Sequence, residues 1–135
     1  MARVFILEDN KFRIDIFRKN IRCEELVIAT SYQEAKVLWK DNYFDVVFLD
    51  HDLGGNKESD CIREVNVGCR FARDVKESLF KSLVFVHSMN PNGRREISLI
   101  SNGSELPFIC INWENLNCLL MDPDQIKSQI ENSFQ

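Results

Sequence analysis

Five short, uninterrupted apolar runs constrain the fold of this chain more than any other feature. A strand buried on both faces is apolar throughout, whereas a strand with one wet face alternates apolar and polar residues. The five predicted strands span residues 4–7, 26–29, 45–50, 83–86 and 107–111. Stretches with helical spacing separate them, so we expect an α/β fold, a three-layer α/β/α sandwich around a five-stranded parallel sheet.

Predicted helices occupy most of the segments between these strands. They span residues 11–21, 31–41 and 68–80, a short stretch from a turn at 91–93 to residue 100, and the chain from 122 onward. Ser31, with Glu34 three positions later, has the pattern of a capping box. This pattern predicts that the second helix starts at Ser31.

The length of 135 residues predicts one domain, 1–135, that can bury a core without disulfides or a structural metal. Residues 53–67 are mostly polar and include the pair Gly54-Gly55, so we expect a lid-like insertion there. Five scattered cysteines form no C-x-x-C pair, which argues against a zinc site. With no signal-peptide pattern or apolar run long enough to span a membrane, we expect reduced thiols and a cytoplasmic location, in the host cytoplasm if a phage encodes the chain.

The charge balance bears on the choice of partner. The chain carries 17 basic and 21 acidic residues, a net charge of −4. Because double-stranded DNA and acidic membranes attract basic proteins, neither is an expected partner. A ligand that contains phosphate would need a local cation, from a metal ion or from a few arginines. A homodimer stays open.

Polar residues cluster where three of the predicted strands end. Glu8 and Asp9 follow the first strand, Asp50-His51-Asp52 ends the third, and His87 follows the fourth. Carboxyl ends of parallel strands meet at one edge of the sheet, where α/β proteins bind their ligands. We therefore expect a divalent-metal or acid/base site at this edge, with Mg²⁺ or Mn²⁺ as the favoured ion. The alternative is that single aspartates here form turns and single histidines fill the core.

These residues resemble a known family. The acidic pair Glu8 and Asp9, the aspartate Asp50 after the third strand and the hydroxyl of Ser88 after the fourth are similar to the response-regulator receiver domain. The resemblance implies a receiver or flavodoxin-like sandwich with strand order 2-1-3-4-5. It further implies Mg²⁺ on the acidic pair and a phosphoryl group on Asp50. The predicted fifth strand departs from the pattern, because no lysine follows it in Cys-Ile-Asn-Trp at 110–113.

Three longer motifs are similar to a receiver-derived group, the cyclic-phosphate processing receiver domain. They are Leu-Glu-Asp-Asn with an arginine at 7–13, Leu-Asp-His-Asp-Leu-Gly-Gly at 49–55 and His-Ser-Met-Asn-Pro followed by a glycine at 87–93. The resemblance implies processing of a cyclic nucleotide or of RNA that ends in a cyclic phosphate. It also implies small proteins of bacteria and phages, with a role in nucleotide-signal defence or counter-defence.

Opening a cyclic phosphodiester needs an activated water, charge stabilisation and a protonated leaving oxygen. The residues expected to hold the metal are Glu8, Asp9, Asp50 and Asp52. Those expected to act on the reacting atoms are Asp50 and the two histidines, His51 and His87, since imidazoles ordinarily titrate near neutral pH. Substrate contacts are expected from Arg13, Ser88, Asn90 and Arg94.

Three classes of function stay open at this point. The first is a metal-dependent cyclic phosphodiesterase, which the crowding of carboxylates and histidines favours. The second is a protein that binds and sequesters a cyclic nucleotide without changing it. The third is an atypical receiver that is phosphorylated on Asp50.

Overall fold

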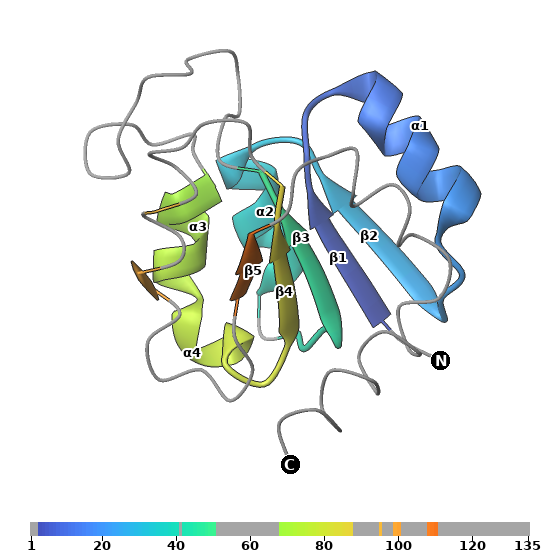
Figure 1. Cartoon of the computed structure of the whole chain (residues 1–135). Coiled ribbons are helices and arrows are strands. Elements are labelled where there is room, and N and C mark those ends of the chain that lie inside the picture. Colours follow the sequence, from blue (N-terminus) through green and yellow to red (C-terminus); the bar gives the residue numbers. More distant parts are fainter. Residues whose placement is uncertain are drawn as a thin grey trace.

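The computed structural model describes residues 3–40, 42–50, 68–87, 95, 99–100 and 108–110. Their strands form one parallel sheet in the order β2-β1-β3-β4-β5, which confirms the predicted order (Figure 1). Along the chain the elements are β1 (Arg3–Leu7), α1 (Lys11–Asn20), β2 (Glu25–Ala29), α2 (Tyr32–Trp39), β3 (Val46–Leu49), α3 (Gly68–Asp74), α4 (Lys76–Leu79), β4 (Leu83–Val86) and β5 (Phe108–Cys110).

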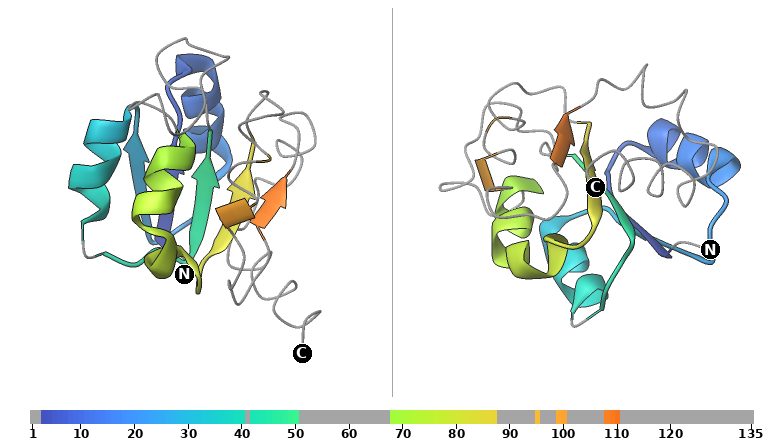
Figure 2. Two further views of the ribbon diagram at one scale, coloured as in Figure 1. Left: turned by 90° about the vertical axis from the view of Figure 1, so that its left-hand side faces the viewer. Right: turned by 60° about the horizontal axis from the view of Figure 1, so that its bottom comes forward.

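The helices cover both faces of the sheet, as a three-layer sandwich requires (Figure 2). On one face Phe17 of α1 packs against Phe48, in a buried cluster that also contains Ile6 and Phe85. The other face is covered by α2, α3 and α4, whose buried side chains include Trp39. Alternate residues of each strand point to opposite faces, so a strand between two helical layers must be apolar at every position.

Aromatic rings fill the core beneath α2 and α3. The ring of Phe5 lies at its centre, with centroid distances of 5.0 Å to Trp39, 5.2 Å to Phe44 and 5.5 Å to Phe71. Such edge-on and offset contacts add stability beyond the burial of apolar area. This apolar core anchors the strands whose ends carry the polar residues.

The helix predicted at 68–80 is interrupted, and this prediction of one continuous helix is wrong. Val75 separates α3 from α4 with a backbone φ of −115° and ψ of 18°. The amide of Val75 still donates to the carbonyl of Phe71 at 3.1 Å, so the chain direction continues across the break. A β-branched residue crowds the preceding helical turn, and Val75 packs against the core beneath α2 and α3.

The predicted N-terminus of α2 is confirmed in its main contact. The hydroxyl of Ser31 accepts a hydrogen bond from the amide of Glu34 at 3.1 Å. The carboxylate of Glu34 in turn accepts from the amide of Thr30, one residue earlier than in a regular capping box.

Arg95, Leu99 and Ile100 are helical, in agreement with the helix predicted there, whereas the lid-like insertion at 53–67 and the helix from 122 lie outside the described residues. No helix in the described ranges is long and apolar enough to cross a membrane.

Candidate functional site

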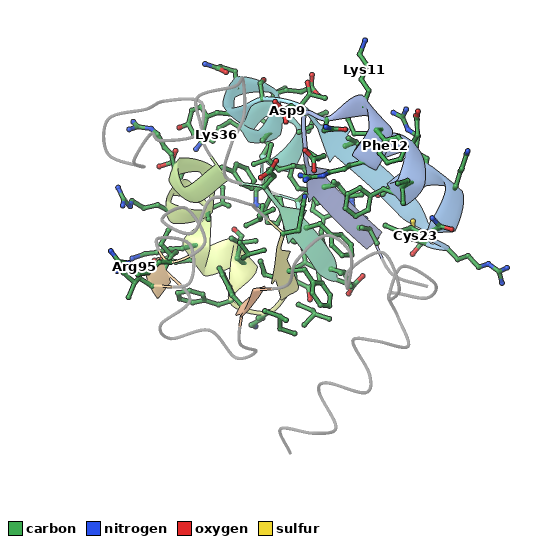
Figure 3. All side chains as sticks on the ribbon, turned by 45° about the horizontal axis from the view of Figure 1, so that its top comes forward. Asp9, Lys11, Phe12, Cys23, Lys36 and Arg95 are labelled. Atoms are coloured by element: carbon green, nitrogen blue, oxygen red, sulfur yellow. The ribbon has the colours of Figure 1, made fainter. Side chains whose placement is uncertain are left out.

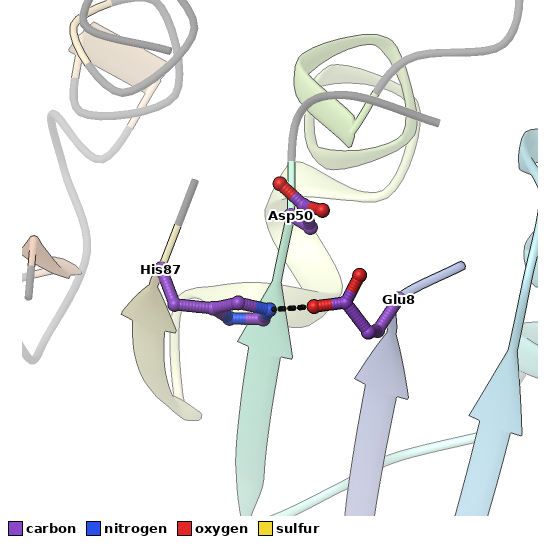
Figure 4. Close-up of side chains that lie close together, drawn as sticks. All are labelled: Glu8, Asp50 and His87. Atoms are coloured by element: carbon purple, nitrogen blue, oxygen red, sulfur yellow. Dashed lines mark hydrogen bonds and ion pairs between the residues drawn. The ribbon is translucent and has the colours of Figure 1, made fainter. Parts of the chain in front are cut away.

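The site is built on three strands that are neighbours in the sheet, β1, β3 and β4. Glu8, Asp50 and His87 each follow the last residue of one of these strands, so they lie side by side at the carboxyl edge (Figure 4). The hydrogen-bond ladder extends past the strand ends. The amides of Asp50 and His87 donate to the carbonyls of Leu7 and Leu49, both at 3.0 Å. The sheet itself therefore fixes the backbone of the site.

The three side chains form a compact and buried group. One ligand atom from each of Glu8, Asp50 and His87 lies within 4.8 Å of the others. Glu8 and His87 are completely buried, and Asp50 is only 4% exposed. Buried charged groups are costly unless they are paired, so the contacts of these residues determine whether the site is stable.

Glu8 is surrounded by hydrogen-bond donors. Its Oε2 accepts from the amides of Asp9 at 3.0 Å and of Asn10 at 3.1 Å. Its Oε1 lies 3.0 Å from Nε2 of His87 and 3.4 Å from Nη1 of Arg13. Because an ionised carboxylate can only accept, Nε2 of His87 carries the hydrogen in this contact. Both oxygens of Glu8 are thus used to hold neighbouring groups.

The environment of Glu8 lowers the pKa of its carboxyl group. Burial alone would raise its pKa, because it disfavours the charged form. The hydrogen bond with His87, electrostatic attraction to His87, the amide of Asn10 and a hydrogen bond with Asp50 outweigh this effect and lower the pKa from 4.5 to about 2. Glu8 is therefore ionised at any ordinary pH.

Arg13 is the cation of the group that reaches solvent. Its Nη1 lies 3.4 Å from Oε1 of Glu8 and 4.0 Å from Oδ2 of Asp50, and its side chain is 20% exposed. The helix start holds its backbone, because the amide of Arg13 donates to the side chain of Asn10, the N-cap of α1. Arg13 thus bridges the two buried carboxylates from the outer side.

His87 is held by α1 as well as by Glu8. Its ring lies edge-on to Phe17, with a centroid distance of 5.6 Å and an angle of 64°. Phe17 was predicted only as an apolar position of the helix, and its contact with the site was missed. The spacing carried a signal, since Phe17 lies four residues after Arg13 and shares its helix face. The first two turns of α1 therefore supply both a cation and an apolar wall to the site.

The structure brings together Glu8, Asp50, His87 and Arg13, four of the predicted site residues. Asp9 is half-buried and lies beside Glu8, yet it is not one of the three residues in the compact group. Asp9 and Lys11 lie at the same end of the molecule, where Lys11 points away from the protein (Figure 3). Five further predicted site residues lie outside the described residues: His51, Asp52, Ser88, Asn90 and Arg94.

The two carboxylates are ligands of the kind that suits Mg²⁺ or Mn²⁺, whereas an imidazole nitrogen is a ligand that suits transition metals and not Mg²⁺. The close approach of the ligand atoms of Glu8, Asp50 and His87 fits the binding of a divalent ion. The edge of the sheet is also where the fold places ligands. The described residues are therefore compatible with the predicted metal, whose identity stays a prediction.

Solved receiver domains share this fold at low sequence identity. The CheY-like receiver domain protein from Methanospirillum hungatei JF-1 is 16% identical, with a TM-score of 0.64 over 98% of this chain and 95% of that one. The response regulatory domain of mrkE from Klebsiella pneumoniae is 12% identical, with a TM-score of 0.65 over 98% of this chain and 97% of that one. TrrA from Thermotoga maritima, solved in complex with Mg²⁺-BeF, is 14% identical, with a TM-score of 0.55 over 98% of both chains.

Sequence comparison is more specific than the shared fold. No curated protein matches this chain significantly. The family model of the cyclic-phosphate processing receiver domain matches residues 6–102, a range that contains Glu8, Arg13, Asp50 and His87. Because the match extends over more than half of the chain, this protein belongs to the cyclic-phosphate processing receiver domain family.

Proposed function

We propose that this protein is a metal-dependent phosphodiesterase that opens the cyclic phosphate of a nucleotide or of an RNA end. The observation that carries the proposal is the buried group of Glu8, Asp50 and His87 at the ligand-binding edge of a receiver fold. Membership of a cyclic-phosphate processing family supports the choice of substrate. In a bacterium or a phage, such an activity would remove a nucleotide signal used in defence.

The metal would be held by Glu8 and Asp50, together with Asp9 and the predicted ligand Asp52. Bound there, a divalent ion would offset the charge of the phosphate and acidify a bound water. Arg13, which reaches solvent beside Asp50, is placed to contact a phosphate oxygen. Ionic and bidentate contacts of this kind are the ones that guanidinium groups make best with phosphate.

His87 would act as an acid or base through its second ring nitrogen, Nδ1. Because Nε2 is engaged by Glu8, Nδ1 is the atom at which His87 would take up or release a proton. The contacts of the ring with Glu8 and Phe17 fix its orientation, which lowers the entropy cost of proton transfer. His51 is the predicted second acid/base group, and Ser88, Asn90 and Arg94 are the predicted phosphate contacts.

A receiver switch is the second candidate, and the position of Asp50 favours it. Asp50 follows the central strand β3, between β1 and β4, in a fold shared with receiver domains. The sequence at 110–113 lacks the lysine that the receiver resemblance leads one to expect. The enzyme is therefore the first proposal and phosphorylation of Asp50 the second.

A turnover assay separates hydrolysis from sequestration. The protein is incubated with 2′,3′-, 3′,5′- and oligomeric cyclic nucleotides, with and without Mn²⁺ or Mg²⁺, and the products are separated by chromatography. We expect metal-dependent hydrolysis that falls by about 100-fold or more in Asp50→Asn, because the site loses a charged ligand. Asp74→Asn is the matched control, since Asp74 lies on α3, contacts α2 and should leave turnover intact.

The other outcomes identify the alternatives. Tight binding of a nucleotide that is recovered unchanged would indicate a sequestering protein. No turnover, together with a mass increase on acetyl phosphate that Asp50→Asn abolishes, would indicate a receiver switch. Either result would overturn the proposed hydrolysis.

A further inference from the structure

The position of Arg13 has a consequence for metal binding. Its Nη1 lies 3.4 Å from Glu8 and 4.0 Å from Asp50, and these two carboxylates belong to the group that would hold the ion. Ligand atoms that lie within 4.8 Å of one another leave little room for two cations. A guanidinium and a divalent ion that approach the same buried oxygens also repel each other, more strongly than in water.

We propose that Arg13 is the built-in cation of this site and competes with a divalent metal ion for Glu8 and Asp50. This inference rests on the metal site of the proposed function and adds the residue that sets its affinity. With Arg13 in place, one positive charge already offsets part of the charge of the two carboxylates. A metal ion must displace the guanidinium before it can use the same oxygens.

The structure of the helix start makes such a displacement feasible. The backbone of Arg13 is fixed by the N-cap Asn10, whose side chain accepts from its amide at 3.2 Å. The long side chain can therefore rotate about its own bonds while the helix stays in place. Its exposure of 20% shows that it is in contact with solvent, unlike the completely buried side chains of Glu8 and His87.

Displacement would also bring the guanidinium toward the substrate. A side chain that leaves the two carboxylates stays at the same edge of the sheet, where a phosphate group would approach the metal. One residue would thus offset part of the charge of the carboxylates before the metal arrives and bind phosphate afterwards. The energetic coupling between metal and phosphate would then depend on Arg13.

The test measures Mn²⁺ binding by calorimetry in the absence of any nucleotide. We expect Arg13→Gln to bind Mn²⁺ at least about tenfold more tightly than the wild type, because the competing charge is gone. Arg13→Lys, which keeps the charge on a shorter side chain, should lie between the two. Lys36→Gln is the matched control: it removes a cation that pairs with Asp74, so it separates a local effect from a change in net charge.

An unchanged or weaker Mn²⁺ affinity in Arg13→Gln would overturn the competition, and so would an equal gain in Lys36→Gln. If neither the wild type nor Arg13→Gln binds Mn²⁺ at millimolar concentration, the competition and the metal site both fail. If Arg13→Gln binds more tightly but no cyclic nucleotide is hydrolysed, the competition stands and the proposed function fails.

A second measurement covers the case in which the variants misfold. In the wild-type protein, the side-chain nitrogen signals of Arg13 should shift during a Mg²⁺ titration followed by NMR. The shift should saturate together with metal binding, because the guanidinium leaves the carboxylates as the ion arrives. Binding of Mg²⁺ without any change in these signals would overturn the proposal.

Discussion

Two of the polar clusters in the described part of the chain contain carboxylates and cations but lie in different surroundings. The first, the edge cluster, lies at the carboxyl edge of the sheet and consists of Glu8, Arg13, Asp50 and His87. The second, the interhelix cluster, joins α2 to α3. It consists of Tyr32, Lys36, Arg70 and Asp74. In each, a carboxylate accepts from a neutral or positively charged partner.

Burial separates the two clusters. In the edge cluster the side chains of Glu8 and His87 have no exposed surface, whereas in the interhelix cluster Lys36 is 42% and Asp74 29% exposed. Water can replace a lost partner at the surface but not in the interior. Exposed ion pairs therefore contribute about 0–1 kcal/mol, while breaking a buried pair costs about 3–5 kcal/mol. Similar contacts should thus differ severalfold in their effect on stability.

The largest expected effect is the loss of the Glu8 charge. Glu8→Gln should lower the free energy of unfolding by about 3–5 kcal/mol, because it leaves the buried His87 without the carboxylate that pairs with it and removes one of the two carboxylates beside Arg13. Asp74→Asn, the matched change in the interhelix cluster, should cost less than about 1 kcal/mol. Urea denaturation followed by tryptophan fluorescence measures both. Equal losses in the two variants would show that burial does not separate the clusters.

The pH dependence of stability sharpens the same comparison. The pKa of Glu8 is lowered to about 2 in the folded protein, so its contribution is fully present above about pH 4.5. The contribution is lost as the pH falls toward 2, because the proton binds the unfolded chain first. The shift corresponds to on the order of 3 kcal/mol.

Measuring the wild type against Glu8→Gln isolates this contribution from those of the other carboxylates. The difference in unfolding free energy should be largest above pH 4.5 and should shrink toward pH 2, where about half of the wild-type Glu8 side chains are protonated in the folded protein. A difference that stays constant between pH 5 and pH 2 would mean that the charge of Glu8 does not stabilise the fold.

The contrast also shows what the sequence could predict. Each strand was recognisable because it is apolar at every position, and the parallel order then placed Glu8, Asp50 and His87 at one edge. The side-chain pairing within the edge cluster was less accessible. Glu8 was expected as a metal ligand and as a partner of Arg13. The structure adds the hydrogen bond with His87, which no local pattern could reveal because the two residues are far apart in the chain.

The features that sequence patterns missed depend on tertiary packing. The break at Val75 depends on a backbone conformation that helix periodicity does not encode. The contact between Phe17 and His87 joins residues that are far apart in the chain, so only the packing of α1 on the sheet brings them together. Periodicity identifies which face of an element is buried, but the partner on that face is set by the whole fold.

The smallest expected effect belongs to the interhelix cluster. The hydroxyl of Tyr32 donates to Asp74, and this hydrogen bond raises the pKa of Tyr32 above its usual value of 10, with burial as a weaker cause. Asp74→Asn should lower that pKa back toward 10, because the phenolate no longer forms beside a carboxylate. Ultraviolet titration in a Tyr43→Phe background follows Tyr32 alone, since the chain has two tyrosines. The stability that this hydrogen bond adds should be fully present below pH 10 and decline as the pH rises further. An unchanged pKa of Tyr32 in Asp74→Asn would mean that the hydrogen bond with Asp74 does not raise this pKa.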